Sequence, residues 1–140
     1  MRTRRLLALL LTLACPPALA DIAVIANANG PVKQLTATEI RDLYLGRVKA
    51  FSNGTFAQVF DHRRDATLRE RFFQAIAGMS QPQVNAYWSR LAFSGQVQPP
   101  QTAADDRGIV ELVRATPAGI GYVSADRVDG SVKVLLTLKD

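Results

Sequence analysis

The chain has 140 residues, of which 48% are hydrophobic and 21% charged, and its formal net charge is +5. That length suits one globular domain with a hydrophobic core rather than two. One cysteine and one histidine exclude a disulfide scaffold and leave too few ligands for a typical zinc centre.

Residues 1–20 have the pattern of a secretory signal peptide. A basic start is followed by an apolar run from Leu6 to Ala14, and Ala18 and Ala20 provide the small residues of a cleavage site. The apolar run is too short to span a bilayer. We therefore expect a periplasmic protein that is cleaved after Ala20 and does not span the membrane.

Loss of this leader changes the charge and the cysteine count. Its three arginines go with it, so the formal charge falls from +5 to +2 and nucleic acid is not expected as a partner. Cys15 also goes; lipidation at Cys15 is the alternative, and Pro16 directly after it argues against that. The mature domain, residues 21–140, then has no thiolate, and we expect no cofactor and no metal.

The mature chain begins with an apolar run at residues 21–26, which is typical of a buried strand. Thr36 and Glu39 have the spacing of a capping box at the start of a short helix, and Gly46 is suited to end it in the left-handed conformation. Three residues form the apolar face of that helix: Ile40, Leu43 and Tyr44.

A second strand at residues 56–60 leads through a charged turn into a helix at 66–77, which Gly78 ends. We expect Asp65 to cap this helix and His62, Arg63 and Arg64 to lie exposed at its mouth. A helix that begins after a strand presents backbone N–H groups to an anion. The alternative is that these residues form an ordinary solvated surface.

A second capping box, Ser80 and Gln83, begins a helix at residues 81–93. Trp88 is expected in the core, with a ligand platform as the alternative. Pro99 and Pro100 indicate an extended loop. The elements expected after that loop are a helix at 104–115 and strands at 120–123 and 132–136. This order predicts an α/β fold with a mixed sheet flanked by helices, and the two adjacent helices argue against a plain βαβ repeat.

Two segments resemble the phosphate-binding proteins of bacterial ABC importers. Residues 35–46, Leu-Thr-x-x-Glu-Ile-x-x-Leu-Tyr-Leu-Gly, are similar to a helix of that family. Residues 116–123, Thr-Pro-Ala-Gly-Ile-Gly-Tyr-Val, resemble one of its strand entries. The resemblance implies one lobe of a type 2 periplasmic-binding protein fold, with an ABC permease or a periplasmic sensor domain as partner.

The same resemblance implies a ligand-binding site at the charged turn. The relatives carry Arg-x-x-x-Ser-Gly-Thr there and bind phosphate with the arginine and the hydroxyls. Here Arg63 and Thr67 stand in for the arginine and the threonine, Arg64 adds a second cation, and the Ser-Gly pair is absent. Asp65 brings a negative charge to the same place, so any phosphate or related oxyanion is expected to bind weakly.

Two other functions compete with oxyanion binding. A lobe that has lost its ligand would act as an interaction or sensory module, and its basic cluster, Arg63, Arg64, Arg69 and Arg71, would meet an acidic partner. An enzyme is not expected, because His62 lies between acids on a turn and no serine has a nucleophile-elbow pattern around it.

Overall fold

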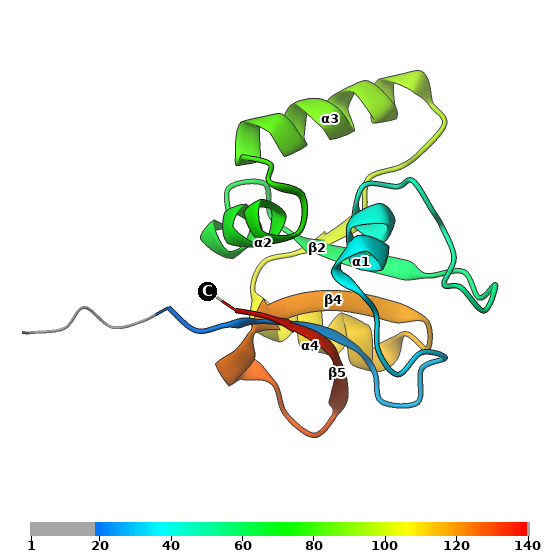
Figure 1. Ribbon diagram of the computed structural model, residues 1–140, viewed down its shortest axis with the longest axis vertical. Helices are drawn as coiled ribbons and strands as arrows, with labels where there is room; N and C mark the ends of the chain where they lie inside the picture. Colours follow the sequence, from blue (N-terminus) through cyan, green and yellow to red (C-terminus); the bar gives the residue numbers. More distant parts are fainter. Residues whose placement is uncertain (1–18, 140) are drawn as a thin grey trace, which may run out of the picture.

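Five strands form one mixed sheet in the order β3-β2-β4-β1-β5 (Figure 1). Strand β2 runs parallel to β3 and β4, whereas β1 runs antiparallel to β4 and β5. Their bounds are β1 Ile22–Asn27, β2 Gln58–His62, β3 Gln101–Ala103, β4 Gly119–Ser124 and β5 Val132–Leu138. The expected α/β class with a mixed sheet is confirmed.

This computed structural model describes residues 19–139. The expected signal peptide and the lipidation alternative at Cys15 fall almost wholly on residues 1–18 and so lie outside the described residues. None of the helices within residues 19–139 combines the length and the apolar character that a membrane span requires.

Helices cover both faces of the sheet (Figure 1). Helix α4 packs on one face, against β4 and β1, while α1 and α2 lie on the other and α3 lies outside α2. Their bounds are α1 Ala37–Tyr44, α2 Thr67–Ala77, α3 Gln81–Ser94 and α4 Asp106–Ala115, with a short 3-10 helix η1 at Ala125–Arg127.

The helix ends follow from local sequence. Thr36 with Glu39 and Ser80 with Gln83 both form the predicted capping boxes, which satisfy the backbone N–H groups that a first turn leaves free. Gly78 ends α2 with a left-handed φ of 63°, as predicted.

Aromatic side chains fill the core between the sheet and helices α1, α2 and α3. Tyr122 of β4 stacks on Phe72 of α2 with 3.7 Å between ring centroids. Trp88 is 7% exposed and joins the same cluster as Phe72 and Ile76, with Tyr87 and Leu91 packed against it. Trp88 is therefore a core residue, as predicted.

Strand β3 differs from the sequence prediction. Gln101–Ala103 were expected in the extended loop after Pro100, but they pair in parallel with Phe60, Asp61 and His62 of β2. A three-residue edge strand of mostly exposed residues has no room for the alternation that identifies a strand. This pairing also extends β2 to His62, two residues beyond its expected end.

Candidate functional site

The parallel strands β2, β3 and β4 end at one edge of the sheet, and α2 and α4 begin there. Their last residues are His62, Ala103 and Ser124. In α/β proteins, this carboxyl edge with helix N-termini pointing at it is where ligands bind. The charged turn, residues 63–66, lies at this edge and joins β2 to α2.

The turn presents its charged side chains to solvent. The Nε atom of Arg63 lies 3.8 Å from Oδ1 of Asp65, and these side chains are 62% and 82% exposed. The guanidinium of Arg64 makes no ion pair or hydrogen bond within residues 19–139. Thr67 is the exposed first residue of α2. The structure thus gathers Arg63, Arg64, Asp65 and Thr67 at the start of one helix.

The expectation that Asp65 caps α2 is wrong. The N-cap residue is Ala66, which has no side chain able to accept a hydrogen bond. Helices α1, α3 and α4 are all capped by a side-chain oxygen, from Thr36, Ser80 and Asp105 respectively. The N–H groups in the first turn of α2 therefore have no side-chain acceptor and remain available to an anion.

The expectation that His62 lies exposed on the turn is also wrong, because it is the buried last residue of β2. Its Nε2 lies 2.8 Å from the carbonyl oxygen of Tyr122 and 3.6 Å from Oδ1 of Asp106. Since a carbonyl only accepts, Nε2 carries the proton and donates it to Tyr122. Among the described residues, no serine hydroxyl bonds this ring.

A buried carboxylate lies beneath the turn. Asp61, 3% exposed, accepts hydrogen bonds from the backbone N–H of His62, the hydroxyl of Tyr122 and Nε of Arg69 at 3.0 Å. Burial, followed by the neighbouring Asp61 charge, raises the pKa of Tyr122 well above its usual value. The phenol therefore stays protonated and donates to Asp61.

Arg69 connects this carboxylate to α3. Its Nη1 donates to Oε1 of Gln81 at 2.6 Å, to Oδ1 of Asn85 at 2.8 Å and to the carbonyl of Arg64 at 3.4 Å. Arg69 is 4% exposed and so cannot belong to a surface cluster, and Arg71 is half-buried with Nη2 donating to the carbonyl of Ala20. The predicted basic surface cluster is therefore reduced to Arg63 and Arg64.

Sequence reasoning missed Gln81 and Asn85. Gln81 also donates from Nε2 to the carbonyl of Ala66 at 2.9 Å. The two residues are four apart on α3, which places both side chains on one face toward the turn. That spacing was the available signal, but nothing in the sequence pointed to the partner they share.

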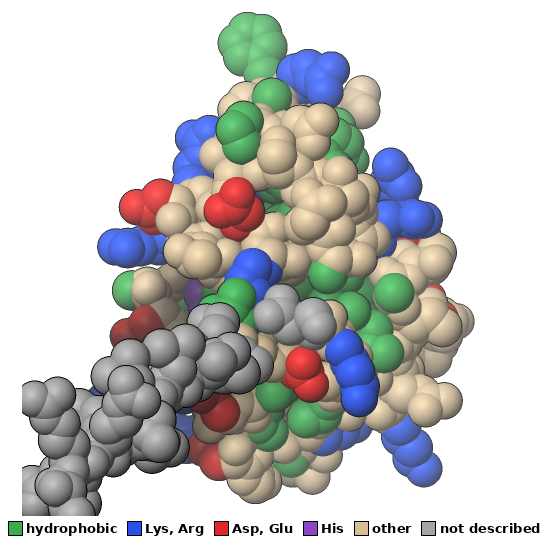
Figure 2. All heavy atoms as spheres, turned by 60° about the vertical axis from the view of Figure 1, so that its left-hand side comes forward, with side chains coloured by type: hydrophobic (Ala, Val, Ile, Leu, Met, Phe, Trp, Pro, Cys, Tyr) green, Lys and Arg blue, Asp and Glu red, His purple; other side chains and the backbone are tan. Residues whose placement is uncertain are grey.

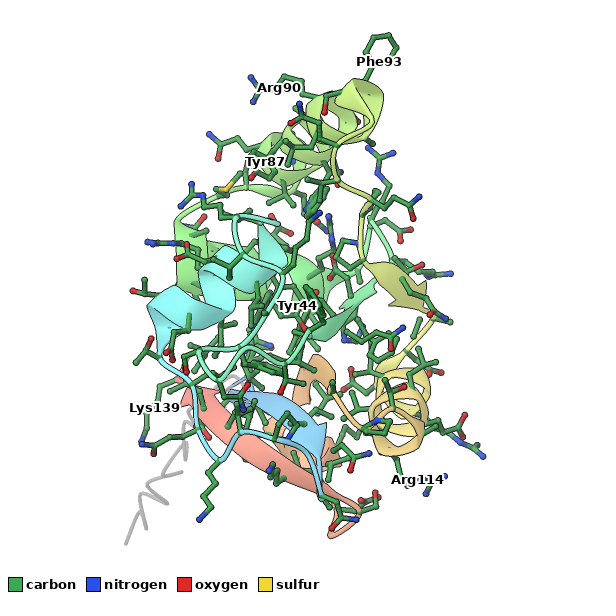
Figure 3. All side chains as sticks on the ribbon, turned by 90° about the vertical axis from the view of Figure 1, so that its right-hand side faces the viewer. Tyr44, Tyr87, Arg90, Phe93, Arg114 and Lys139 are labelled. Atoms are coloured by element: carbon green, nitrogen blue, oxygen red, sulfur yellow. The ribbon has the colours of Figure 1, made fainter. Side chains whose placement is uncertain are left out.

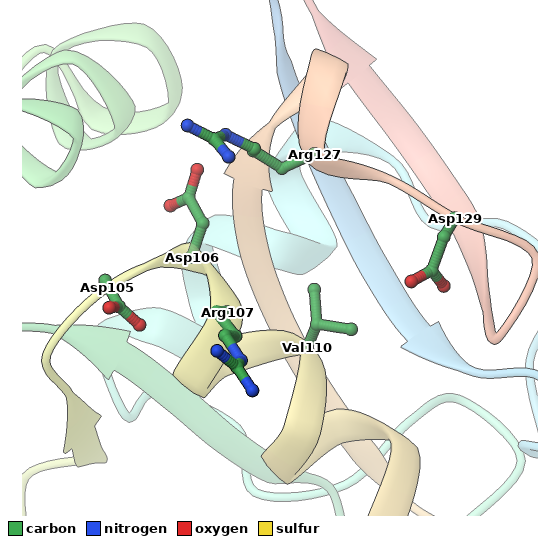
Figure 4. Close-up of a pocket in the computed structure, with 6 residues that line it drawn as sticks. All are labelled: Asp105, Asp106, Arg107, Val110, Arg127 and Asp129. Carbon is green, nitrogen blue, oxygen red and sulfur yellow. The ribbon is translucent and has the colours of Figure 1, made fainter.

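Two hollows lie near the carboxyl edge of the parallel strands. One of about 290 Å³ lies between α3 and strands β2 and β3, and Arg64 and Arg69 belong to its lining. A second of about 520 Å³ lies at the start of α4, where Asp106 and Arg127 project toward each other and Asp129 lies beyond Val110 (Figure 4). Three carboxylates against two arginines line it, which does not favour an anion.

No three His, Cys, Asp or Glu side chains converge to hold a metal ion in the described part of the chain. Basic and acidic side chains are interspersed over the face seen in Figure 2. That surface does not present a continuous basic patch.

The fold is shared with proteins that handle phosphate. A structure from Clostridium perfringens, described as a phosphate ABC transporter substrate-binding protein with bound phosphate, matches 84% of this chain with a TM-score of 0.67 and 24% identity. An ABC-type phosphate transport receptor from Vibrio cholerae matches 84% with a TM-score of 0.67 and 20% identity. PstS from Borrelia burgdorferi matches 84% with a TM-score of 0.64 and 10% identity.

The matched region covers 45%, 46% and 47% of those three chains, so this chain spans less than half of their length. No protein-family model matches the chain, and no curated protein sequence does. Structural matches at such low sequence identity establish the fold alone, and this fold is the expected one. Residues 19–139 adopt a phosphate-binding-protein-like fold as a single lobe.

Proposed function

We propose that this protein is exported and binds phosphate or a related oxyanion weakly at the N-terminus of α2. One observation carries the proposal: the only α-helix among residues 19–139 without a side-chain cap begins beside two exposed arginines. This helix start lies at the carboxyl edge of the parallel strands, in a fold that matches a protein solved with bound phosphate.

Each residue of the turn has a defined role. Arg63 and Arg64 supply positive charge and hydrogen bonds, Thr67 supplies a hydroxyl, and the first-turn N–H groups of α2 supply the rest. Asp65 opposes binding, because its carboxylate lies 3.8 Å from the Arg63 guanidinium and competes for it.

The affinity follows from the exposure of these groups. A hydrogen bond to a charged group contributes about 1.5–3 kcal/mol when well formed. Arg63 is 62% exposed, so solvent and salt screen its contact toward the lower limit. Two such contacts together contribute about 3–6 kcal/mol, which corresponds to a dissociation constant on the order of tens of micromolar to several millimolar.

Isothermal titration calorimetry with orthophosphate at low salt tests the site. Arg63→Ala should weaken binding and added salt should weaken it further, whereas Asp65→Ser should strengthen it by removing the competing carboxylate. Arg90, which projects from the outer end of α3 (Figure 3), is the matched control, and Arg90→Ala should leave binding unchanged.

Equal affinities for wild type, Arg63→Ala and Asp65→Ser would show that the turn is not the anion site. A periplasmic interaction or sensory module of the same fold would then be the function to pursue.

Export and partners are proposed on the leader sequence and the family resemblance. The mature protein in a periplasmic extract should begin at or near Asp21, which mass spectrometry of its N-terminus would establish; a lipidated Cys15 would contradict it. The proposed partner is an ABC permease or a periplasmic sensor domain, which should co-purify with the protein when membranes are solubilised. The structural neighbours are described as binding and transport proteins, and we propose no catalytic step.

A further inference from the structure

We propose that the ligand is an organic phosphate, whose phosphoryl group meets the turn and whose small polar substituent enters the 290 Å³ hollow beneath it. This inference rests on the proposed function, since it places the phosphoryl group at the same helix start. It goes further by naming the ligand class and a second half of the site.

Arg64 joins the two halves. It belongs to the turn that holds the phosphoryl group, and it also lines the hollow. Arg69, in the first turn of α2, lines the hollow too. A phosphoryl group held at the start of α2 therefore lies at the rim of the hollow. The ester oxygen or carbon that links it to the substituent is free to point into the hollow.

The size of the hollow fits a substituent. It measures about 290 Å³, roughly ten times the 30 Å³ that a water molecule occupies in the liquid. Small-molecule pockets begin near 300 Å³. An orthophosphate ion at the turn would leave most of this space to solvent.

The lining is mixed in the way that a small polar substituent requires. Trp88, Pro99 and Pro100 give it apolar walls, while Ser89 and Thr102 add hydroxyl groups. The charges of Asp61 and Arg69 neutralise each other across 3.0 Å. The hollow therefore suits a substituent with hydroxyl groups and no strong charge of its own.

Two residues of the lining carry a donor that has no partner among residues 19–139. The indole Nε1 of Trp88 is buried without a hydrogen-bond acceptor in the described part of the chain. Asn85 accepts a hydrogen bond from Arg69 at its Oδ1, and its amide nitrogen makes no hydrogen bond within residues 19–139. A buried donor such as the Trp88 indole is rarely left unpaired, and oxygen atoms on a bound substituent would satisfy it and the half-buried Asn85 amide.

Trp88 separates this hollow from a neighbouring one of about 430 Å³. The benzo edge of the ring packs closely against Gly46, just after the end of α1: a Cβ atom added to Gly46 would lie only 2.9 Å from Cη2 of Trp88. This close packing fixes the ring in place. A fixed ring between two hollows gives the substituent a rigid apolar surface, which costs little entropy to bind against.

Calorimetry with the purified protein tests the inference by comparing orthophosphate, glycerol 3-phosphate and glycerol. Glycerol 3-phosphate should bind about tenfold more tightly than orthophosphate, which is a modest gain for a few buried contacts, and glycerol alone should not bind measurably. Ser89→Leu, which fills the hollow from the exposed side of α3, should abolish the gain while leaving orthophosphate binding unchanged.

A second variant tests the indole directly. Trp88→Phe keeps an aromatic ring and removes the N–H donor, so it should reduce the advantage of glycerol 3-phosphate over orthophosphate. Thermal unfolding of each variant establishes that it is folded, and Ser89→Leu remains the test if Trp88→Phe is not.

The outcomes separate the two proposals. If orthophosphate binds and glycerol 3-phosphate binds no better, the organic-phosphate inference is overturned and the oxyanion site stands. The inference is also overturned if Ser89→Leu leaves the gain intact. If neither phosphate binds, the proposed function fails and this inference fails with it.

Discussion

Replacing Arg69 with alanine should lower the free energy of unfolding by about 3–5 kcal/mol, because it leaves a buried carboxylate without its cation. Asp61 is 3% exposed and Arg69 is 4% exposed. Solvent therefore cannot replace the lost guanidinium, as it would at a surface ion pair.

The magnitude follows from the contacts that are lost. Arg69 donates four hydrogen bonds, to Asp61, Gln81, Asn85 and the Arg64 carbonyl, and its guanidinium carbon lies 5.2 Å from the centre of the Phe73 ring. Asp61 keeps only the Tyr122 hydroxyl and the His62 N–H. Against a typical total stability of about 5–15 kcal/mol, this single loss is a large share.

Urea denaturation followed by tryptophan fluorescence would measure the change. Arg63→Ala is the matched control, because its pair with Asp65 is exposed and should contribute no more than about 0.5 kcal/mol. Replacing both partners, by Asp61→Asn with Arg69→Met, should recover part of the loss since no buried charge remains. If Arg69→Ala costs no more than Arg63→Ala, Arg69 is a surface cation after all and the buried network is refuted.

Two further perturbations probe the core. Trp88→Ala should cost about 3 kcal/mol, at the low end for a buried tryptophan because hollows border the ring. Phe93→Ala, where the ring is 96% exposed, should change the denaturation midpoint little, and equal effects would place Trp88 outside the core. Burial raises the pKa of Tyr44 and of Tyr122 well above 10.0, so the folded protein retains protons that the unfolded chain releases, and stability should fall as the pH rises above about 10. Tyr44→Phe should make that decline shallower in denaturation curves, and an unchanged slope would contradict the assignment.

Features set by neighbouring residues were predictable from the sequence. The two capping boxes, at Thr36 and Ser80, the left-handed Gly46 and the helix end at Gly78 all occur as predicted. Each depends on residues no more than four positions apart, so the local pattern contains all the information needed. The fold class followed from the order of such elements.

Apart from the cap expected from Asp65, the features that were missed depend on residues far apart in the chain. His62 contacts Tyr122 across 60 residues, and Arg69 contacts Asn85 across 16. The sequence did hold one signal for Arg69, because it precedes Phe72, Phe73 and Ile76 at the spacing of a buried helical face. A charged residue at such a position needs a buried partner, but periodicity alone does not identify Asp61 as that partner.

The buried network also explains how an exposed turn can hold a defined shape. Three backbone carbonyls of the turn accept hydrogen bonds. The Arg69 side chain donates to the carbonyl of Arg64, and the Gln81 side chain donates to the carbonyl of Ala66. The backbone N–H of Ala66 donates to the carbonyl of Arg63. His62, directly before the turn, is fixed by the Tyr122 carbonyl. The N–H groups of α2 and the cations Arg63 and Arg64 thus start from an ordered backbone. When an anion binds, only side chains then have to become ordered, which lowers the entropic cost of binding. This lower cost offsets part of the binding free energy that each contact loses through its exposure to solvent.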